Sequence, residues 1–149
     1  MAGALYRGGV IRLLGHAERL NWLSTDAATY AALSKSAYTP TYTDTNYTTI
    51  AGAMETTNDA GSGYTAKGKT FAPVNPAYEL DTYNYIKCDG ADPQAWTSST
   101  FTTNGACIWN DTATNDPLFC WTDFGADKAV VAGTLTVQWD AKGIFRIKI

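Results

Sequence analysis

Residues 105–149 decide the fold, and they read GACIWNDTATNDPLFCWTDFGADKAVVAGTLTVQWDAKGIFRIKI. Apolar and polar residues alternate over 134–139 and again over 145–149. A period of two is typical of a strand that buries one face. The polar segment between them, residues 140–143, ends in Gly and predicts a hairpin turn. We therefore expect these two strands to pair with each other.

Two earlier runs in the same stretch, residues 106–109 and 118–121, are apolar at consecutive positions. Such runs are typical of strands that are covered on both faces. Residues 110–117 join them and are rich in Asn, Asp and Pro, which favour turns. The sequence thus predicts a four-strand unit at the core of one β domain.

The composition limits the classes of partner. A chain of 149 residues is expected to form one domain, which can bury about two thirds of the surface of its unfolded chain. The net charge is −3 and the eleven Lys and Arg are scattered, which argues against a nucleic-acid partner. The N-terminal sequence has no apolar run long enough for a signal peptide or a membrane span, so we expect no membrane partner.

The three cysteines, Cys88, Cys107 and Cys120, are odd in number and not closely spaced, so they do not indicate a disulfide framework. Two of them lie inside apolar strand runs, where a thiol usually acts as a small buried hydrophobe. Reduced thiols fit a protein that folds in a cytoplasm. A disulfide between Cys107 and Cys120 across paired strands stays open as the less favoured alternative.

The rest of the chain completes an all-β prediction. Residues 1–9 are small and Gly-rich and predict an N-terminal arm that orders against a partner, while residues 10–149 form the β domain. Residues 27–36 are Ala-rich, which leaves a helix and a strand open. Residues 37–49 predict a long surface loop, and residues 50–55 predict one helical turn. The fold class is therefore an antiparallel sandwich or jelly-roll-like single domain with at most one or two short helices.

The residues that usually carry chemistry form no recognisable site. His16 is the only histidine, and no nucleophile elbow accompanies it. Acidic loops at 89–92 and 110–116 offer oxygen ligands but lack a calcium-loop pattern, so we expect their side chains to bond their own turns. We predict no catalytic residue, no metal site and no cofactor.

The five Trp and nine Tyr are the other candidates for a site. They could form a sugar-stacking platform, or they could pack in the core and at a protein interface. Trp109, Trp121 and Trp139 lie in apolar strand runs, so we expect them in the core. Trp22, Trp96 and the loop tyrosines are freer. Core and interface packing is favoured over ligand stacking.

A set of motifs in fixed order adds a resemblance. The motifs are SAYTP (36–40), GSGYTAKGKT (61–70), WTSSTF (96–101), GACIWNDT (105–112), DPLFCWTDFG (116–125) and GTLTVQWDAKGIFRI (133–147). From about Ala27 to its end, the chain resembles a family of small structural proteins that are encoded among the virion genes of tailed bacteriophages. In similar proteins a strand precedes the SAYTP-like motif, which favours a strand over residues 27–36.

The resemblance implies a non-enzymatic virion protein that is made in the bacterial host cytoplasm. The leading expectation is a capsid decoration (cement) protein that binds the major capsid protein on the outer capsid surface, stabilises the head and self-associates, with a trimer as the expected state. A minor tail, baseplate or head–tail component is one alternative, and a carbohydrate- or receptor-binding module is another. The expected contacts are Tyr6 and Arg7 of the arm, and Tyr38, Tyr42 and Tyr47 of the Tyr-rich loop.

Overall fold

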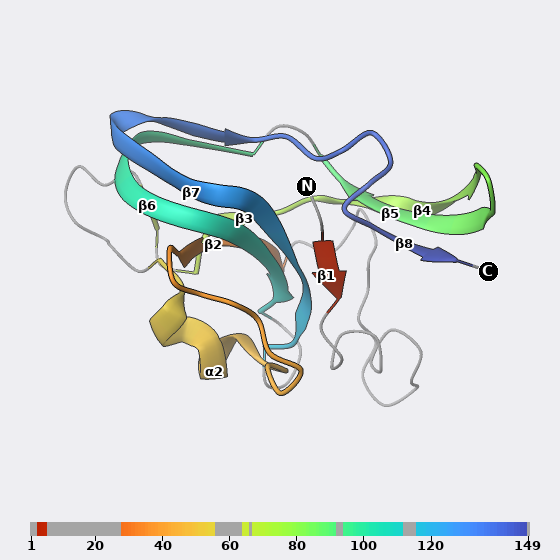
Figure 1. Cartoon of the computed structure of the whole chain (residues 1–149), viewed down its shortest axis with the longest axis horizontal. Helices are drawn as coiled ribbons and strands as arrows, with labels where there is room; N and C mark the ends of the chain where they lie inside the picture. Colours follow the sequence, from red (N-terminus) through yellow and green to blue (C-terminus); the bar gives the residue numbers. More distant parts are fainter. Residues whose placement is uncertain are drawn as a thin grey trace.

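The computed structural model describes residues 3–5 (backbone only), 28–55, 64–65, 67–91, 94–111 and 116–148, and strands in two antiparallel sheets dominate it (Figure 1). The strands are β1 (Gly3–Leu5), β2 (Thr29–Lys35), β3 (Lys69–Thr70), β4 (Pro73–Leu80), β5 (Asn84–Gly90), β6 (Gln94–Asn110), β7 (Leu118–Val137) and β8 (Phe145–Lys148). A short helix α2 (Tyr47–Ile50) and a 3-10 turn η1 (Ala51–Ala53) follow β2. The predicted all-β class is confirmed, whereas a jelly-roll topology stays a prediction.

The larger sheet has the strand order β1-β7-β6-β2-β3. Its centre is the long antiparallel pair β6 and β7, which runs from Gln94 opposite Val137 to Trp109 opposite Leu118 and shifts its register at four places. Residues 106–109 and 118–121 are buried throughout, as their consecutive apolar residues predict. Both faces of the sheet are therefore covered at this place.

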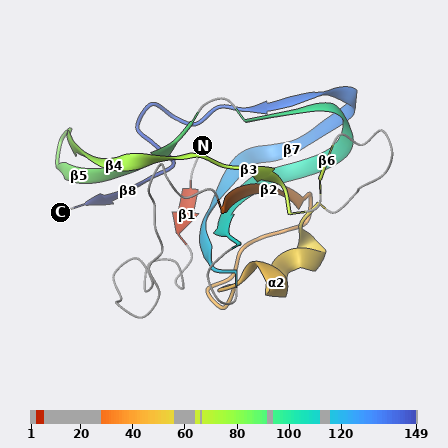
Figure 2. The same ribbon diagram turned by 180° about the vertical axis from the view of Figure 1, so that it is seen from behind.

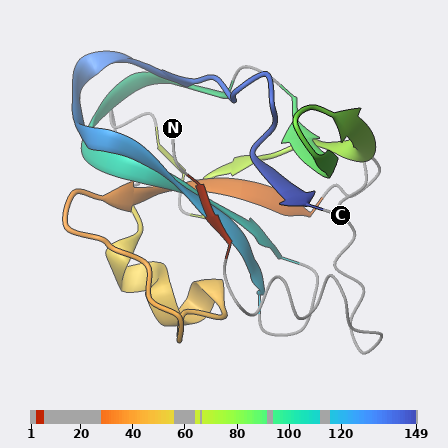
Figure 3. The same cartoon turned by 45° about the vertical axis from the view of Figure 1, so that its right-hand side comes forward.

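The core lies on both sides of the larger sheet. Figure 3 shows α2 on one side of this sheet and the smaller β4–β5–β8 sheet on the other. The cluster between the sheets includes Leu33, Phe71, Trp96, Ile108, Phe119, Cys120 and Phe145. The cluster beneath α2 includes Tyr38, Tyr47, Ile50, Met54, Cys107, Trp109 and Trp121. Alternate residues of β6 over 106–109 thus serve two different clusters, and residues 118–121 of β7 are divided between the same two.

The predicted hairpin of 134–139 with 145–149 is wrong. Residues 134–137 extend β7 and pair with β6, where Thr136 lies opposite Ala95. Strand β8 pairs instead with β5 in the smaller sheet, where Phe145 lies opposite Cys88. Residues 140–143 therefore carry the chain from one sheet to the other. Alternation identifies the buried face of a strand but not its neighbour, and β5 offers the apolar face that matches β8.

Residues 29–35 form a strand, β2, as the resemblance favours over a helix. This strand pairs along β6, with Leu33 opposite Ala106. Ala31 and Ala32 are fully buried there, and the backbone at Gly68 passes directly over them. The Ala-rich sequence of β2 therefore lies in a buried strand, because tertiary packing overrides its helix propensity.

The predicted N-terminal arm is in part a strand of the sheet. Within it, Gly3–Leu5 form β1 and pair with β7, Gly3 opposite Thr122 and Leu5 opposite Cys120. These three residues of the arm pair within the chain, and the expectation that a partner orders the rest of the arm stays a prediction. Tyr6 and Arg7 lie outside the described residues.

Candidate functional site

The loop over residues 36–46 connects β2 to α2 and is closed by one carboxylate. Asp44 Oδ2 accepts hydrogen bonds from the Tyr38 hydroxyl at 2.9 Å and from the Thr41 backbone N–H at 2.8 Å. The Asp44 backbone N–H donates to the Thr41 carbonyl at 3.1 Å. Aspartate commonly organises turns in this way. The loop therefore holds a defined shape.

Tyr38 anchors one end of the loop to the sheet. Its ring is 9% exposed and meets the Trp121 ring edge-on at 6.2 Å between centroids. The Asn104 side-chain amide donates to the Tyr38 carbonyl at 2.7 Å. The amide oxygen of Asn104 accepts from the Ser34 hydroxyl at 2.7 Å, and that hydroxyl accepts from Trp121 Nε1 at 3.1 Å. Strands β2, β6 and β7 thus each contribute to this anchor.

Tyr47 anchors the other end, at the start of α2. Its ring is 6% exposed and stacks on Trp109 at 4.0 Å between centroids. The Tyr47 backbone N–H donates to the Asp116 carbonyl at 2.8 Å, and the Leu118 N–H donates to the Thr45 carbonyl at 3.1 Å. Burial raises the pKa of Tyr47 to about 12.

The anchors leave Tyr42 at the surface of the loop, with 76% of its side chain exposed. Tyr38 and Tyr47, which we expected to contact a partner, are instead packed in the core, because Trp121 and Trp109 lie beneath the two ends of the loop. Among the described residues of the predicted contact set, Tyr42 alone is exposed. The candidate partner-binding site is therefore the Tyr42 loop, which we define as residues 36–46.

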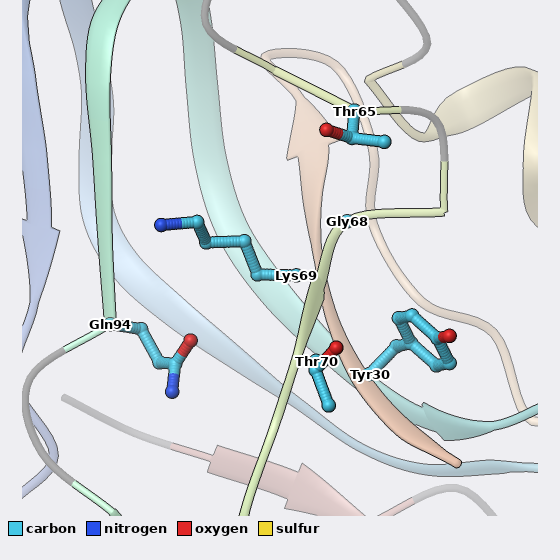
Figure 4. Close-up of a pocket in the computed structure, with 6 residues that line it drawn as sticks. All are labelled: Tyr30, Thr65, Gly68, Lys69, Thr70 and Gln94. Atoms are coloured by element: carbon cyan, nitrogen blue, oxygen red, sulfur yellow. The ribbon is translucent and has the colours of Figure 1, made fainter. Parts of the chain in front are cut away.

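An open depression of about 430 Å³ lies beside β3, lined by Tyr30, Thr65, Gly68, Lys69, Thr70 and Gln94 (Figure 4). Figure 4 shows Lys69 and Gln94 on one side of β3 and Tyr30 on the other. The Lys69 ammonium already donates to the Ala95 carbonyl, and the Tyr30 ring stacks on Trp109. The polar groups do not converge on one point, so the depression makes a weaker candidate than the loop.

The described tryptophans pack in the core. Trp109, Trp121 and Trp139 are buried, as predicted, and Trp96, which we expected to be freer, is fully buried. Trp22 lies outside the described residues. Cys88, Cys107 and Cys120 are free and buried. The sugar platform would have to come from tyrosines, of which Tyr42, Tyr78 and Tyr83 are the most exposed in the described ranges.

Two exposed apolar residues on β4, Tyr78 and Leu80, were missed as candidates. The sequence of residues 77–87 predicts a strand or a bent pair of strands. Apolar residues occur at both the odd and the even positions of this segment, so they would lie on both faces of a strand. Apolar residues on both faces could have indicated an exposed apolar surface, but the sequence does not show which of the two faces stays uncovered.

Within the described part of the chain, no group of three or more His, Cys, Asp or Glu is placed to hold a metal ion, and no helix is long and apolar enough to span a membrane. Comparisons with protein-family models, with curated proteins and with solved structures return no match for this chain. The resemblance to phage virion proteins stays a prediction, and the Tyr42 loop is the strongest candidate site in the described part of the chain.

Proposed function

We propose that the protein is a non-enzymatic virion structural protein of a tailed bacteriophage, which decorates the outer capsid surface and stabilises the head. The observation that carries the proposal is the Tyr42 loop, because it combines one exposed aromatic side chain with two buried anchors. The SAYTP motif of the phage resemblance lies in the same loop.

A loop of this kind suits a stable contact with a protein. Binding costs less free energy when the contact residues are already ordered in the free protein. Asp44, Tyr38 and Tyr47 supply that order here. Tyrosine is among the residues that most often dominate the energy of an interface. Tyr42 is therefore the side chain that we expect to enter a pocket or groove of the capsid subunit.

Head stabilisation follows from mass action. A protein that binds the assembled lattice but not free subunits stabilises the lattice by its binding free energy. A decoration protein that also joins neighbouring subunits, or neighbouring copies of itself, gains further through effective concentration. Neither effect needs a catalytic group, and the ordered Tyr42 loop supports such a contact.

The test is co-sedimentation with capsids of the encoding phage that have been purified without this protein. We expect the wild-type chain to bind, and Tyr42→Ala to weaken binding about 30-fold, which corresponds to about 2 kcal/mol for an anchoring tyrosine. Val131→Ala is the matched control, because Val131 is an apolar residue of β7 that is 80% exposed and does not belong to the loop. It should bind as the wild type does.

Three results would count against the proposal. Equal binding by Tyr42→Ala and the wild type would remove the loop from the contact. Binding to purified tails but not to capsids would favour the tail or baseplate alternative. Binding to neither, together with specific binding on a glycan array, would favour the carbohydrate- or receptor-binding module.

A further inference from the structure

The smaller sheet projects beyond the larger one, as Figures 1 and 2 show from opposite sides. Its register places Tyr78 opposite Ile86, Ile86 opposite Ile147, and Leu80 opposite Asn84. Residues that face each other across antiparallel strands point to the same side of a sheet. We call this side, with Tyr78, Leu80, Asn84, Ile86 and Ile147, the overhanging face.

Exposure increases along the overhanging face. Cys88 and Phe145, which continue the same side at its base, are buried in the core between the sheets. Ile86 and Ile147 are half-buried, and Tyr78 and Leu80 are 61% and 72% exposed. The face thus begins as a cover for the core and then continues into solvent. An apolar surface of this kind commonly marks an interaction site.

The opposite side of the same sheet carries charges that are paired within the chain. Arg146 lies 3.3 Å from Asp81 and 3.8 Å from Glu79, and Lys142 lies 2.7 Å from Asp81. The Arg146 guanidinium lies over the Tyr85 ring at 4.3 Å. These charged groups already have partners, so this side does not require another protein.

The overhanging face has no charged side chain, and its polar groups also bond each other, since the Tyr78 hydroxyl donates to Asn84 Oδ1 at 2.8 Å. Strand β4 is an edge of its sheet, but Pro73, Pro76 and a register shift between Val74 and Ala77 interrupt it. Proline and irregular register oppose backbone pairing along an edge. Pairing along the β4 edge is therefore disfavoured, and a partner on this side is expected to contact the side chains of the face.

We propose that the occupant is a second copy of this chain, and that two copies pack their overhanging faces together in a two-fold symmetric contact, in place of the trimer that the resemblance implies. In such a contact a surface meets itself. A charged surface would bring like charges together, whereas this one brings only uncharged groups together, with Tyr78 and Leu80 of each copy at the contact. The association needs no capsid, so it can be tested separately from the proposed function.

The experiment is sedimentation velocity of the full chain, without capsids, over a wide range of concentration. We expect a concentration-dependent dimer. Leu80→Glu should raise the dimer dissociation constant at least about tenfold, because the two-fold axis brings the two carboxylates together in an apolar contact. Val131→Glu places the same charge at a residue of β7 that is 80% exposed, and it should dimerise as the wild type does. Leu80→Ala is a milder variant for the case in which Leu80→Glu does not fold.

Four results would overturn the proposal. The first is a wild-type chain that stays monomeric at every concentration. The second is a dimer that Leu80→Glu and Leu80→Ala leave unchanged. The third is a trimer, because a three-fold contact would bring the face against a different surface. The fourth is a monomer whose melting temperature falls in Leu80→Ala but not in Val131→Ala, because the chain itself would then cover the face.

Discussion

At the scale of single residues, Gly68 sets the path of the chain over β2. Its φ is +90°, and a Cβ there would lie 2.0 Å from the carbonyl oxygen of Ala31. Both the left-handed backbone and the contact oppose any other residue. The sequence predicts a bulge or bend at this glycine, but the close approach depends on Ala31, which lies 37 positions earlier.

We expect Gly68→Ala to lower the free energy of unfolding by about 3 kcal/mol, measured by urea denaturation. Gly52→Ala is the control, because nothing lies within 4 Å of a Cβ at that position in η1. It should change stability by about 0.5 kcal/mol or less. Similar losses in the two variants would mean that Gly68 is not in close contact with β2.

The three tyrosines of the 37–49 loop also show what the sequence can predict at this scale. All three lie in the same Thr-rich context, and nothing local separates Tyr42 from Tyr38 and Tyr47. Their different exposure depends on Trp109 and Trp121, which the fold brings from the far end of the chain. The loop could be predicted, but the exposed member of the set could not.

At the scale of elements, α2 begins with a buried phenol, that of Tyr47, which makes its contribution to stability depend on pH. Burial raises the pKa of Tyr47 to about 12, from 10.0, and the pKa of Tyr64 is raised for the same reason. In the unfolded chain these phenols lose their protons first. The contribution of Tyr47 to stability is therefore complete below pH 10 and is lost as the pH rises from about 10 through about 12. That of Tyr64 starts to be lost in the same range and continues to be lost at higher pH, because its pKa is raised further.

We expect the urea midpoint of the wild type to fall steeply above pH 10. Tyr47→Phe keeps the ring that stacks on Trp109 but has no ionisable group, so its midpoint should fall less steeply over the same range. Part of the slope should persist because Tyr64 is unchanged. Identical pH profiles for the two proteins would show that Tyr47 does not titrate with unfolding.

Strand pairing marks the limit of prediction for elements. The runs at 106–109 and 118–121 predict strands covered on both faces. Successive residues of a strand point to opposite faces, so consecutive apolar residues are stable only where both faces are buried. The alternation at 145–149 predicts a strand, but many strands have a matching face. The choice of β5 as its partner is made by the packing of the whole domain.

At the scale of the whole molecule, all three thiols lie inside the fold. Burial raises the pKa of Cys88 to about 11 and that of Cys120 well above its usual value, and each of the three side chains is buried. A thiol reacts as the thiolate, so the native protein should resist labelling at pH 8. We expect the three cysteines to react together with DTNB, at the rate of global opening, and at once in denaturant. A single thiol that reacts rapidly in the native protein would contradict this.

The order of pairing also affects how the chain folds during its synthesis. Strand β2 pairs with the end of β6, Thr29 opposite Asn110, and β5 pairs with β8, Cys88 opposite Phe145. Contacts between residues so distant in sequence form slowly, because a long loop must close first. The side of β5 that pairs with β8 stays open until β8 has left the ribosome. The smaller sheet therefore cannot be completed before β8 is synthesised, and the nascent protein is prone to aggregation until that strand can pair.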